Sequence, residues 1–391
     1  MKSVGLITEY NPFHNGHLYH AQQSKLQSDA KISIAIMSGN FVMRGEPAIY
    51  NKFLRTKMAL LGVDLVVELP AIASLSSSDY FATFAIKVAH YLDIDTIAFG
   101  SEINDISRLE NVASNINSLE QSSYFQDLIK QGNTYAKIVH DLIDDQQVLR
   151  SPNNILGVAY IKAINNIAPT IKRIAIQRQS TAHHDQEIKH DSFASGSAIR
   201  HALLNKENTW KDVVPSDIKQ LYETPHLLKE QTFNFIKYNI LSRSSEELSH
   251  IYTMSEGFEH RLKSNIQNAQ DFDTFMSLIK TKRFTYTHIQ RVLMQILLNI
   301  NKSDFDDEIR GVRILGMNQR GQQYLKHLKK QFPNRFYVTN INKETASLFK
   351  NEIKATHIYN LISGQRANDF NTPVIINKKG STSNRTDESK Y

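Results

Sequence analysis

Residues 4–18 read VGLITEYNPFHNGHL, and they join an apolar strand to a polar turn and the start of a helix. The apolar run ends at Pro12, and helix-compatible residues follow Gly16. His14 and His17, three residues apart, would lie on one face at the helix N-terminus. A helix start offers free backbone N–H groups and partial positive charge, which favour bound phosphate, and a glycine lets backbone approach a ligand closely. A pair of capping or surface histidines is the alternative.

The alternation of strand and helix continues to residue 203. Further buried strands are predicted at 31–37, 64–70, 95–100 and 172–178, with helices between them. Strands separated by helices form parallel sheets through right-handed crossovers. The predicted fold class is therefore α/β, a doubly wound parallel sheet.

Polar residues follow several of these strands where they end. Gly100 and Arg178 fall at such ends, as does the HNGH turn, and ligands of doubly wound sheets bind beyond the carboxyl ends of the strands. Asn153 and Asn154 follow a serine and a proline at the start of a helix. Their amides could belong to the helix cap or face a ligand.

Residues 194–200, ASGSAIR, form a second polar segment at a predicted helix start. The hydroxyls of Ser195 and Ser197, with nearby backbone N–H groups, can hold phosphate oxygens, and Arg200 adds a cationic fork. Taken alone, the segment is more typical of a helix cap followed by a surface arginine.

Together the two segments resemble the paired signature of the nucleotidylyl transferase superfamily. HNGH resembles its HxGH motif and SGSAIR its ISSTxIR motif, in the expected order along the chain. The resemblance implies an ATP site in which His14 and His17 stabilise charge as pyrophosphate leaves. It also implies that Ser195, Ser197 and Arg200 hold the outgoing phosphates.

The composition excludes several kinds of site. The chain has 391 residues, of which 41% are hydrophobic and 22% charged, and it contains no cysteine. Disulfides, thiolate zinc sites and cysteine nucleophiles are therefore excluded. The chain starts directly with a strand and has no apolar run of membrane-spanning length, which favours a cytoplasmic protein. A net charge of +7 permits a polyanionic partner without identifying one.

Beyond residue 203 the pattern changes. Four stretches are predicted: an ATP-binding domain over 1–203, a mostly helical region over 204–300, a small C-terminal α/β unit over 301–377 and a disordered tail over 378–391. The loop before residue 194 holds His183, His184, Asp185, His190 and Asp191. Their spacing matches no compact ligand pattern, so no metal site is predicted there.

Within the helical region, residues 280–291 read KTKRFTYTHIQR and mix cations with aromatic residues. Cations take phosphates and aromatic faces stack on unpaired bases, so this segment is predicted to be an RNA-binding surface. The charged flank of a core helix would have the same composition.

Five segments, EYNPFHNGH, FGSE, SPNNILG, SGSAIR and KRFTYTHIQR, together resemble the bacterial tRNA(Met) cytidine acetate ligase family. The resemblance implies that acetate and ATP give acetyl-adenylate and pyrophosphate. The exocyclic amine of the wobble cytidine in elongator tRNA(Met) then takes the acetyl group, giving N4-acetylcytidine and AMP. Mg2+ is expected with the triphosphate, and no protein partner can be inferred.

On this interpretation His14 and His17 are catalytic, and Lys280, Lys282, Arg283 and Arg291 contact the tRNA backbone. The ATP site would comprise Ile7, Thr8, Glu9, Tyr10, Asn11, Pro12, Phe13, Asn15, Gly16, Leu18, Gly100, Asn153, Asn154, Arg178, Ser195, Ser197 and Arg200. An acyl pocket could be built by Tyr10, Phe13 or Phe41.

Two other functions share the ATP site. One is an adenylyl or cytidylyl transferase acting on a small phosphorylated metabolite, and the other is a non-catalytic RNA-binding protein on a degenerate scaffold. About half the chain lies past Arg200, which favours a polymeric substrate. The intact polar residues of both motifs disfavour a degenerate scaffold.

Overall fold

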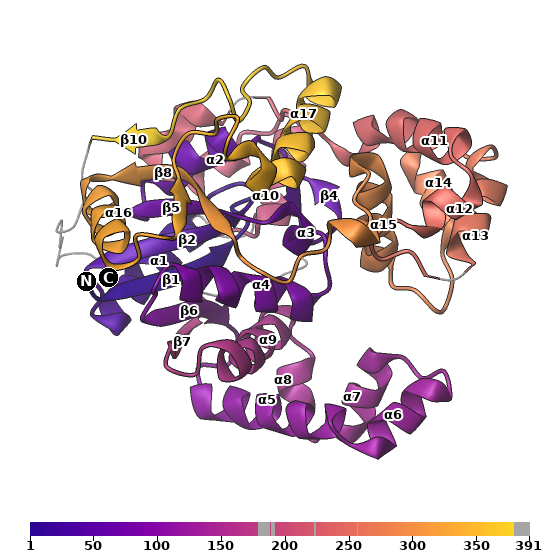
Figure 1. The fold of residues 1–391 in the computed structure, drawn as a ribbon, viewed down its shortest axis with the longest axis horizontal. Coiled ribbons are helices and arrows are strands. Elements are labelled where there is room, and N and C mark those ends of the chain that lie inside the picture. Colours follow the sequence, from indigo (N-terminus) through magenta and orange to yellow (C-terminus); the bar gives the residue numbers. More distant parts are fainter. Residues whose placement is uncertain (179–187, 189–191, 223, 256, 379–391) are drawn as a thin grey trace.

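The computed structural model describes residues 1–178, 188, 192–222, 224–255 and 257–378. Within these residues a mostly parallel, eight-stranded sheet forms the centre, with one group of helices beside it and another below it in the view of Figure 1. The strand order is β10-β8-β5-β2-β1-β6-β7, with β9 paired to β8. The predicted α/β class with a doubly wound sheet is confirmed.

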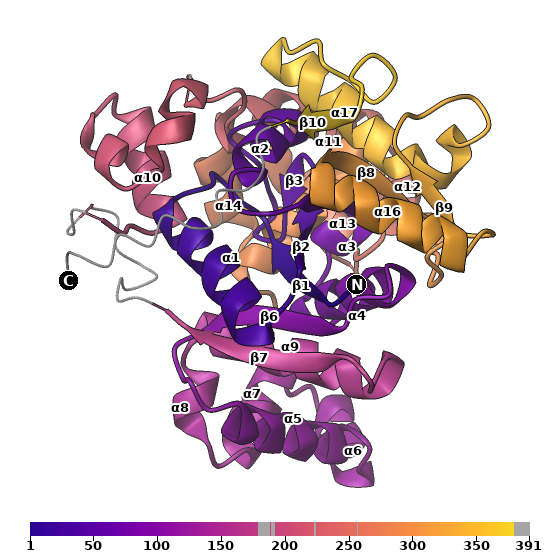
Figure 2. The same cartoon turned by 90° about the vertical axis from the view of Figure 1, so that its left-hand side faces the viewer.

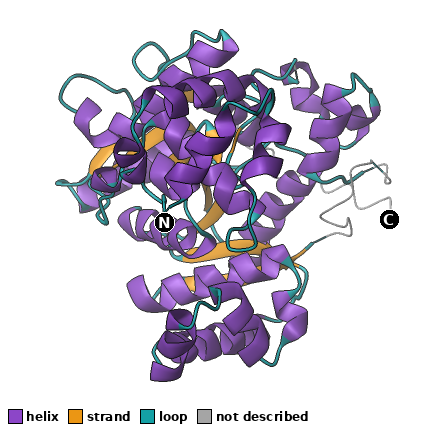
Figure 3. Ribbon diagram, turned by 90° about the vertical axis from the view of Figure 1, so that its right-hand side faces the viewer, coloured by secondary structure: helices purple, strands orange, loops and turns teal. Residues whose placement is uncertain are grey.

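Helices cover both faces of the sheet, so the side chains on both faces of its strands are apolar. In β2 (Ile32–Ser38), Ile32, Ile34 and Ile36 pack into the larger core with α4 (Ser78–Tyr91) and α9 (Pro152–Ile167). Ala35 and Met37 point to the other face, which is covered by α1 (Asn15–Ser28), α2 (Lys52–Ala59) and α10 (Gly196–Leu204). Figure 2 shows α1 running along the sheet, and Figure 3 shows helices around the strands.

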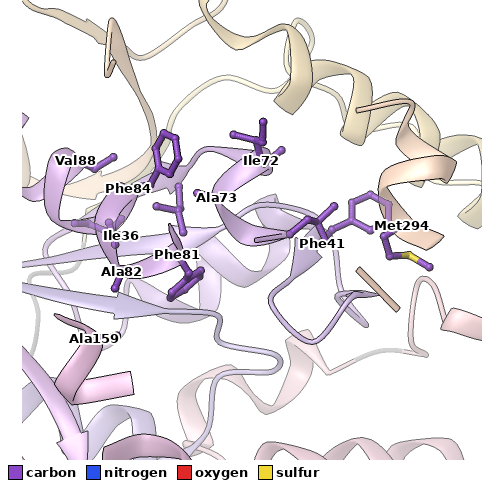
Figure 4. Close-up of a cluster of buried hydrophobic side chains, with 14 of the residues drawn as sticks. Ile36, Phe41, Ile72, Ala73, Phe81, Ala82, Phe84, Val88, Ala159 and Met294 are labelled. Carbon is purple, nitrogen blue, oxygen red and sulfur yellow. The ribbon is translucent and has the colours of Figure 1, made fainter. Parts of the chain in front are cut away.

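The larger core continues from the sheet to the helices beside it. Figure 4 shows Ile36 of β2 together with Phe81, Phe84 and Val88 of α4, and, further along, Met294 of α15 (Tyr286–Leu298). This continuity fixes α15 relative to the sheet.

The strands that flank the site are β1 (Ser3–Thr8), β6 (Thr96–Ser101) and β7 (Lys172–Gln177), which pair in parallel. A short hairpin, β3 (Phe41–Val42) with β4 (Glu46–Pro47), follows β2 at the same edge of the sheet. The carboxyl ends of the parallel strands and this hairpin therefore meet at one place.

The C-terminal stretch is α/β as predicted, but it builds no separate sheet. β8 (Gly311–Asn318) pairs antiparallel with β5 (Leu65–Leu69), while β9 (Phe336–Val338) and β10 (Ile375–Asn377) pair with β8. Buried Lys52 Nζ lies 2.8 Å from both Glu68 Oε1 and Asp369 Oδ1. The Asn318 side chain also donates to Asp64 Oδ1 at 2.8 Å. Residues 301–377 thus complete the N-terminal sheet. The sequence did not predict this, because an apolar strand pattern does not reveal which strand it pairs with.

Two groups of helices extend from the sheet. One comprises α11 (Phe233–Ser242), α12 (Ser245–Ser249), α13 (Phe258–Ile266), α14 (Phe272–Ile279) and α15, in the predicted helical region, and it lies to the right in Figure 1. The other comprises α5 (Ile106–Glu120), α6 (Ser123–Lys130), α7 (Tyr135–Leu142) and α8 (Gln146–Leu149), at the bottom.

The remaining helices are α3 (Ala71–Ser74), α16 (Gln319–Gln331) and α17 (Lys350–Ser363). Across the described residues, every helix is too short or too polar to cross a membrane. His183, His184, Asp185, His190 and Asp191 lie outside the described residues, as does the predicted tail from residue 379 onward.

Candidate active site

A cavity of about 330 Å3 opens where β1, β6 and β7 end. Its walls are the first turn of α1, the β3–β4 hairpin, the start of α9 and the segment that leads into α10. Many of the predicted site residues line it: Ile7, Thr8, Glu9, Tyr10, Asn11, His14, Gly16, His17, Gly100, Asn153, Arg178, Ser195, Ser197 and Arg200. The structure thus brings the two predicted motifs into one cavity.

The two histidines are held at the start of α1. His14 is the N-cap, and its Nδ1 accepts a hydrogen bond from Gly16 N at 3.1 Å. Its ring stacks on that of His17, with 3.8 Å between the ring centroids. A Cβ on Gly16 would lie 2.9 Å from His14 Cε1, so this glycine makes room for the imidazole itself. The HNGH spacing therefore fixes two stacked imidazoles at the start of α1. The first N–H groups of this helix are not free as predicted, because that of Asn15 donates to Val213 O and that of His17 donates to His14 O.

Burial keeps these imidazoles uncharged. Together with the charges of Arg178 and Arg200, it lowers the pKa of His14 to about 3. Burial and the neighbouring histidines lower the pKa of His17 well below its usual value. One turn further, burial and Arg178 lower the pKa of His20 to about 4. At neutral pH the three side chains are therefore neutral hydrogen-bonding groups.

The SGSAIR segment reaches the same place from the other side. Ser195 is the N-cap of α10, and its hydroxyl accepts from Ala198 N at 3.0 Å. Arg200 Nη1 donates to Asn11 O at 2.8 Å, and Nη2 lies 3.3 Å from Ser197 Oγ and 3.5 Å from Glu46 Oε1. Burial lowers the pKa of Arg200 below its usual value. Arg200 thus ties the turn before HNGH to the second motif.

Comparison with known proteins decides the family. A model described as HIGH Nucleotidyl Transferase matches residues 1–372. A tRNA(Met) cytidine acetate ligase of Staphylococcus haemolyticus is 97% identical over 97% of this chain and 100% of its own length. One from Staphylococcus aureus is 58% identical over 96% of this chain and 99% of its own. The chain belongs to the tRNA(Met) cytidine acetate ligase family.

Solved structures agree with this family and with the fold. A crystal structure of Thermotoga maritima TmcAL without ligand has a TM-score of 0.86 and 27% identity, and it covers 97% of this chain and 100% of that one. A second structure of the same protein, bound with alpha-thio ATP, has a TM-score of 0.84 at the same identity and coverage. The predicted family and ligase class are confirmed.

Some residues predicted to form the ATP site or the acyl pocket of this acetate ligase family member do not line the cavity. Phe13 is fully buried and packs in the core beneath the site, with Leu18 packed against the same core. Phe41, considered for an acyl pocket, is buried in the larger core. Pro12 also does not line the cavity. These side chains support the turn because burying apolar surface is favourable.

Two asparagine side chains predicted to contact ATP form hydrogen bonds within the protein instead. Asn15 Nδ2 donates to Ser192 O at 2.9 Å, which ties the start of α1 to the segment before α10. Asn154 Oδ1 accepts from Ser101 Oγ at 2.7 Å and from Glu102 N at 2.9 Å. Asn154 therefore fixes the end of β6, while its neighbour Asn153 lines the cavity.

Sequence reasoning missed part of the cavity wall. His20 lies three residues after His17, so the helical spacing could have revealed it. Met43, Arg44 and Glu46 of the hairpin line the cavity too, but the sequence there predicts only irregular structure. Four further apolar residues of the wall look like ordinary core positions in sequence: Phe81, Phe99, Leu156 and Tyr160.

The cationic segment 280–291 divides into two parts. Lys280, Lys282 and Arg283 are exposed, with the Arg283 guanidinium 5.5 Å from the Phe284 ring centroid and Lys280 Nζ bonded to Thr281 O at 2.6 Å. Arg291 is half-buried instead, and its Nη1 donates to Met43 O at 3.3 Å. Arg291 therefore joins α15 to the hairpin and is not part of the exposed surface.

Proposed function

We propose that the cavity binds ATP and acetate, forms acetyl-adenylate, and passes the acetyl group to N4 of the wobble cytidine in elongator tRNA(Met). The relatives are named tRNA(Met) cytidine acetate ligases, and a structural relative binds alpha-thio ATP. The observation that carries the proposal is the contact of Arg200 with Asn11 O, because it unites the two phosphate-binding motifs in one cavity.

In the first step an acetate oxygen attacks the α-phosphorus of ATP, and the bond to the pyrophosphate oxygen breaks. The neutral imidazoles of His14 and His17 can donate hydrogen bonds to the α-phosphate without a proton being lost or gained. Arg178 and Arg200 supply the positive charge that pyrophosphate needs as it leaves. Since acetate is the nucleophile, the protein contributes positioning and electrostatic stabilisation.

Mg2+ is expected with the triphosphate. Among the described residues, no group of three or more histidine, aspartate or glutamate side chains could hold a metal. With nucleotides, Mg2+ usually takes most of its ligands from phosphate oxygens and water. A tRNA substrate favours the cytoplasm as the place of reaction.

The helical region over 204–300 is the proposed tRNA-binding region, next to the ATP-binding domain over 1–203. Lys282 and Arg283 are exposed there and can meet phosphates, and Lys280 is exposed as well while its Nζ donates to Thr281 O. We keep these three as proposed tRNA contacts and assign Arg291 a positioning role.

The deciding experiment uses the purified full-length protein with ATP, labelled acetate and total bacterial tRNA, followed by nucleoside analysis. Label in acetylcytidine that depends on ATP would support the proposal. Pyrophosphate release with a phosphorylated metabolite, and no label in RNA, would instead identify a small-molecule adenylyl or cytidylyl transferase.

A further inference from the structure

We infer that Glu9 is the general base of acetyl transfer, taking the proton that the cytidine amine loses as it attacks acetyl-adenylate. This inference rests on the proposed function. The first step needs no base, since acetate attacks as an anion. The second step does, because an amine that becomes an amide must lose a proton.

The carboxylates of the cavity have different partners. Among the described residues two line it, Glu9 and Glu46. Glu46 is paired with Arg200 at 3.5 Å. Glu9 Oε1 instead accepts from the backbone N–H of Met43 at 2.7 Å, and within the described part of the chain no cation forms an ion pair with it. Glu9 is thus fixed in position but not neutralised.

The histidines of the cavity are poor proton acceptors. The pKa values of His14 and His20 are lowered to about 3 and 4, and that of His17 is lowered too. Burial acts in the opposite direction on a carboxyl, and it raises the pKa of Glu9 above its usual value. A base works best when its pKa lies near the working pH, so Glu9 is better suited than any of the three.

Charged and titratable groups face Glu9 from several elements. Arg44 and Glu46 on the hairpin, together with Arg200 on α10, act on its pKa in opposite directions, the arginines lowering it and Glu46 raising it. From α9, Tyr160 has a pKa raised by burial and by Glu9. From α2, Arg55 donates to the Glu9 carbonyl oxygen at 2.5 Å.

The position of Glu9 fits the second substrate. β1 lies between β6 and β2, so the cavity has two sides. Gly100 and Arg178 end β6 and β7 on one side, while the hairpin follows β2 on the other. Met43 of the hairpin holds Glu9 through its N–H and receives Arg291 of α15 at its carbonyl oxygen. The hairpin therefore connects Glu9 to α15, the helix that follows the proposed tRNA contacts.

The step balances without any further reactant. The N4 lone pair forms a bond to the acetyl carbon, and the bond from that carbon to the phosphate oxygen breaks, with its electron pair leaving on AMP. The proton passes from N4 to the Glu9 carboxylate and then to solvent.

The test separates the two steps in the full-length protein. Acetate-dependent exchange of pyrophosphate into ATP measures activation without tRNA, and single-turnover transfer from preformed acetyl-adenylate measures the second step. Glu9→Gln keeps an acceptor for Met43 N but cannot take a proton. We expect transfer to slow by about 100-fold or more, with a much smaller loss of exchange. The rise of the transfer rate with pH should also disappear.

Glu46→Gln is the matched control, since Glu46 lines the same cavity but is paired with Arg200. It should affect exchange at least as strongly as transfer. Glu9→Asp, which keeps a carboxylate, should recover part of the transfer rate lost in Glu9→Gln. Equal losses of both steps in Glu9→Gln, or unchanged transfer, would overturn the inference. Absence of exchange in the unaltered protein would overturn the proposed function instead.

Discussion

Replacing Gly45 by alanine should force the β3–β4 hairpin away from α15. Gly45 has a φ of +77°, and a Cβ there would lie 2.4 Å from Arg291 N and 2.6 Å from Gln290 C. Both contacts are with backbone atoms, which cannot swing aside. Left-handed backbone costs about 1–2 kcal/mol in a residue with a Cβ. Forcing packed elements apart typically costs about 1–3 kcal/mol more.

The expected loss for Gly45→Ala is therefore about 2–5 kcal/mol of unfolding free energy. Gly132→Ala is the matched control, because Gly132 has a φ of +86° and no atom within 4 Å of its Cβ position. That variant should lose only about 1–2 kcal/mol. Urea unfolding measures both, and tRNA acetylation should fall further in Gly45→Ala. Equal losses of stability in the two variants would refute the reasoning.

Three further predictions concern charge in and around the site. His17→Ala should reduce acetate-dependent exchange by about 100–1000-fold with an unchanged circular dichroism spectrum, and full activity would remove the ATP-site assignment. Lys282→Gln with Arg283→Gln should weaken tRNA binding and flatten its salt dependence, whereas an unchanged affinity in a salt titration would place the RNA surface elsewhere. Below about pH 6.5 the unfolded chain protonates His14 and His20 while the folded protein does not, so the free energy of unfolding falls with pH. This loss ends near pH 4 for His20 and near pH 3 for His14, the pKa values in the folded protein. Nuclear magnetic resonance titration should find both imidazoles neutral at pH 5, and protonation near pH 6.5 would contradict their burial.

The sequence carries most of the information about the ATP-binding half. An apolar strand ending in HNGH predicts both the carboxyl edge of β1 and the cap of α1, because strand and helix signals there are local. Gly100 and Arg178 could be placed at the cavity since parallel strands end at a common edge. Arg200 could be placed there from the resemblance of SGSAIR to the second motif.

The rest depends on contacts between segments far apart in the chain. Phe13 looks like a ligand contact because it lies within a motif, yet its ring packs in the hydrophobic core beneath the turn. Arg291 resembles its exposed neighbours in composition, but the packing of α15 turns it toward Met43. The role of Glu9 also depends on the hairpin, since Met43 supplies its hydrogen bond. No local pattern encodes such pairings.

The pairing of β5 with β8 has a consequence for how this chain is made. β5 pairs with β2 on one side and with β8 on the other, and Lys52 bonds both to Glu68 and to Asp369. When the ribosome has released the first 203 residues, the outer edge of β5 is still unpaired and half of this ionic cluster has not been synthesised. Open strand edges promote aggregation. The nascent protein therefore exposes this edge until β8 emerges, and a fragment of residues 1–203 should aggregate in a sedimentation assay in which the full-length protein stays soluble.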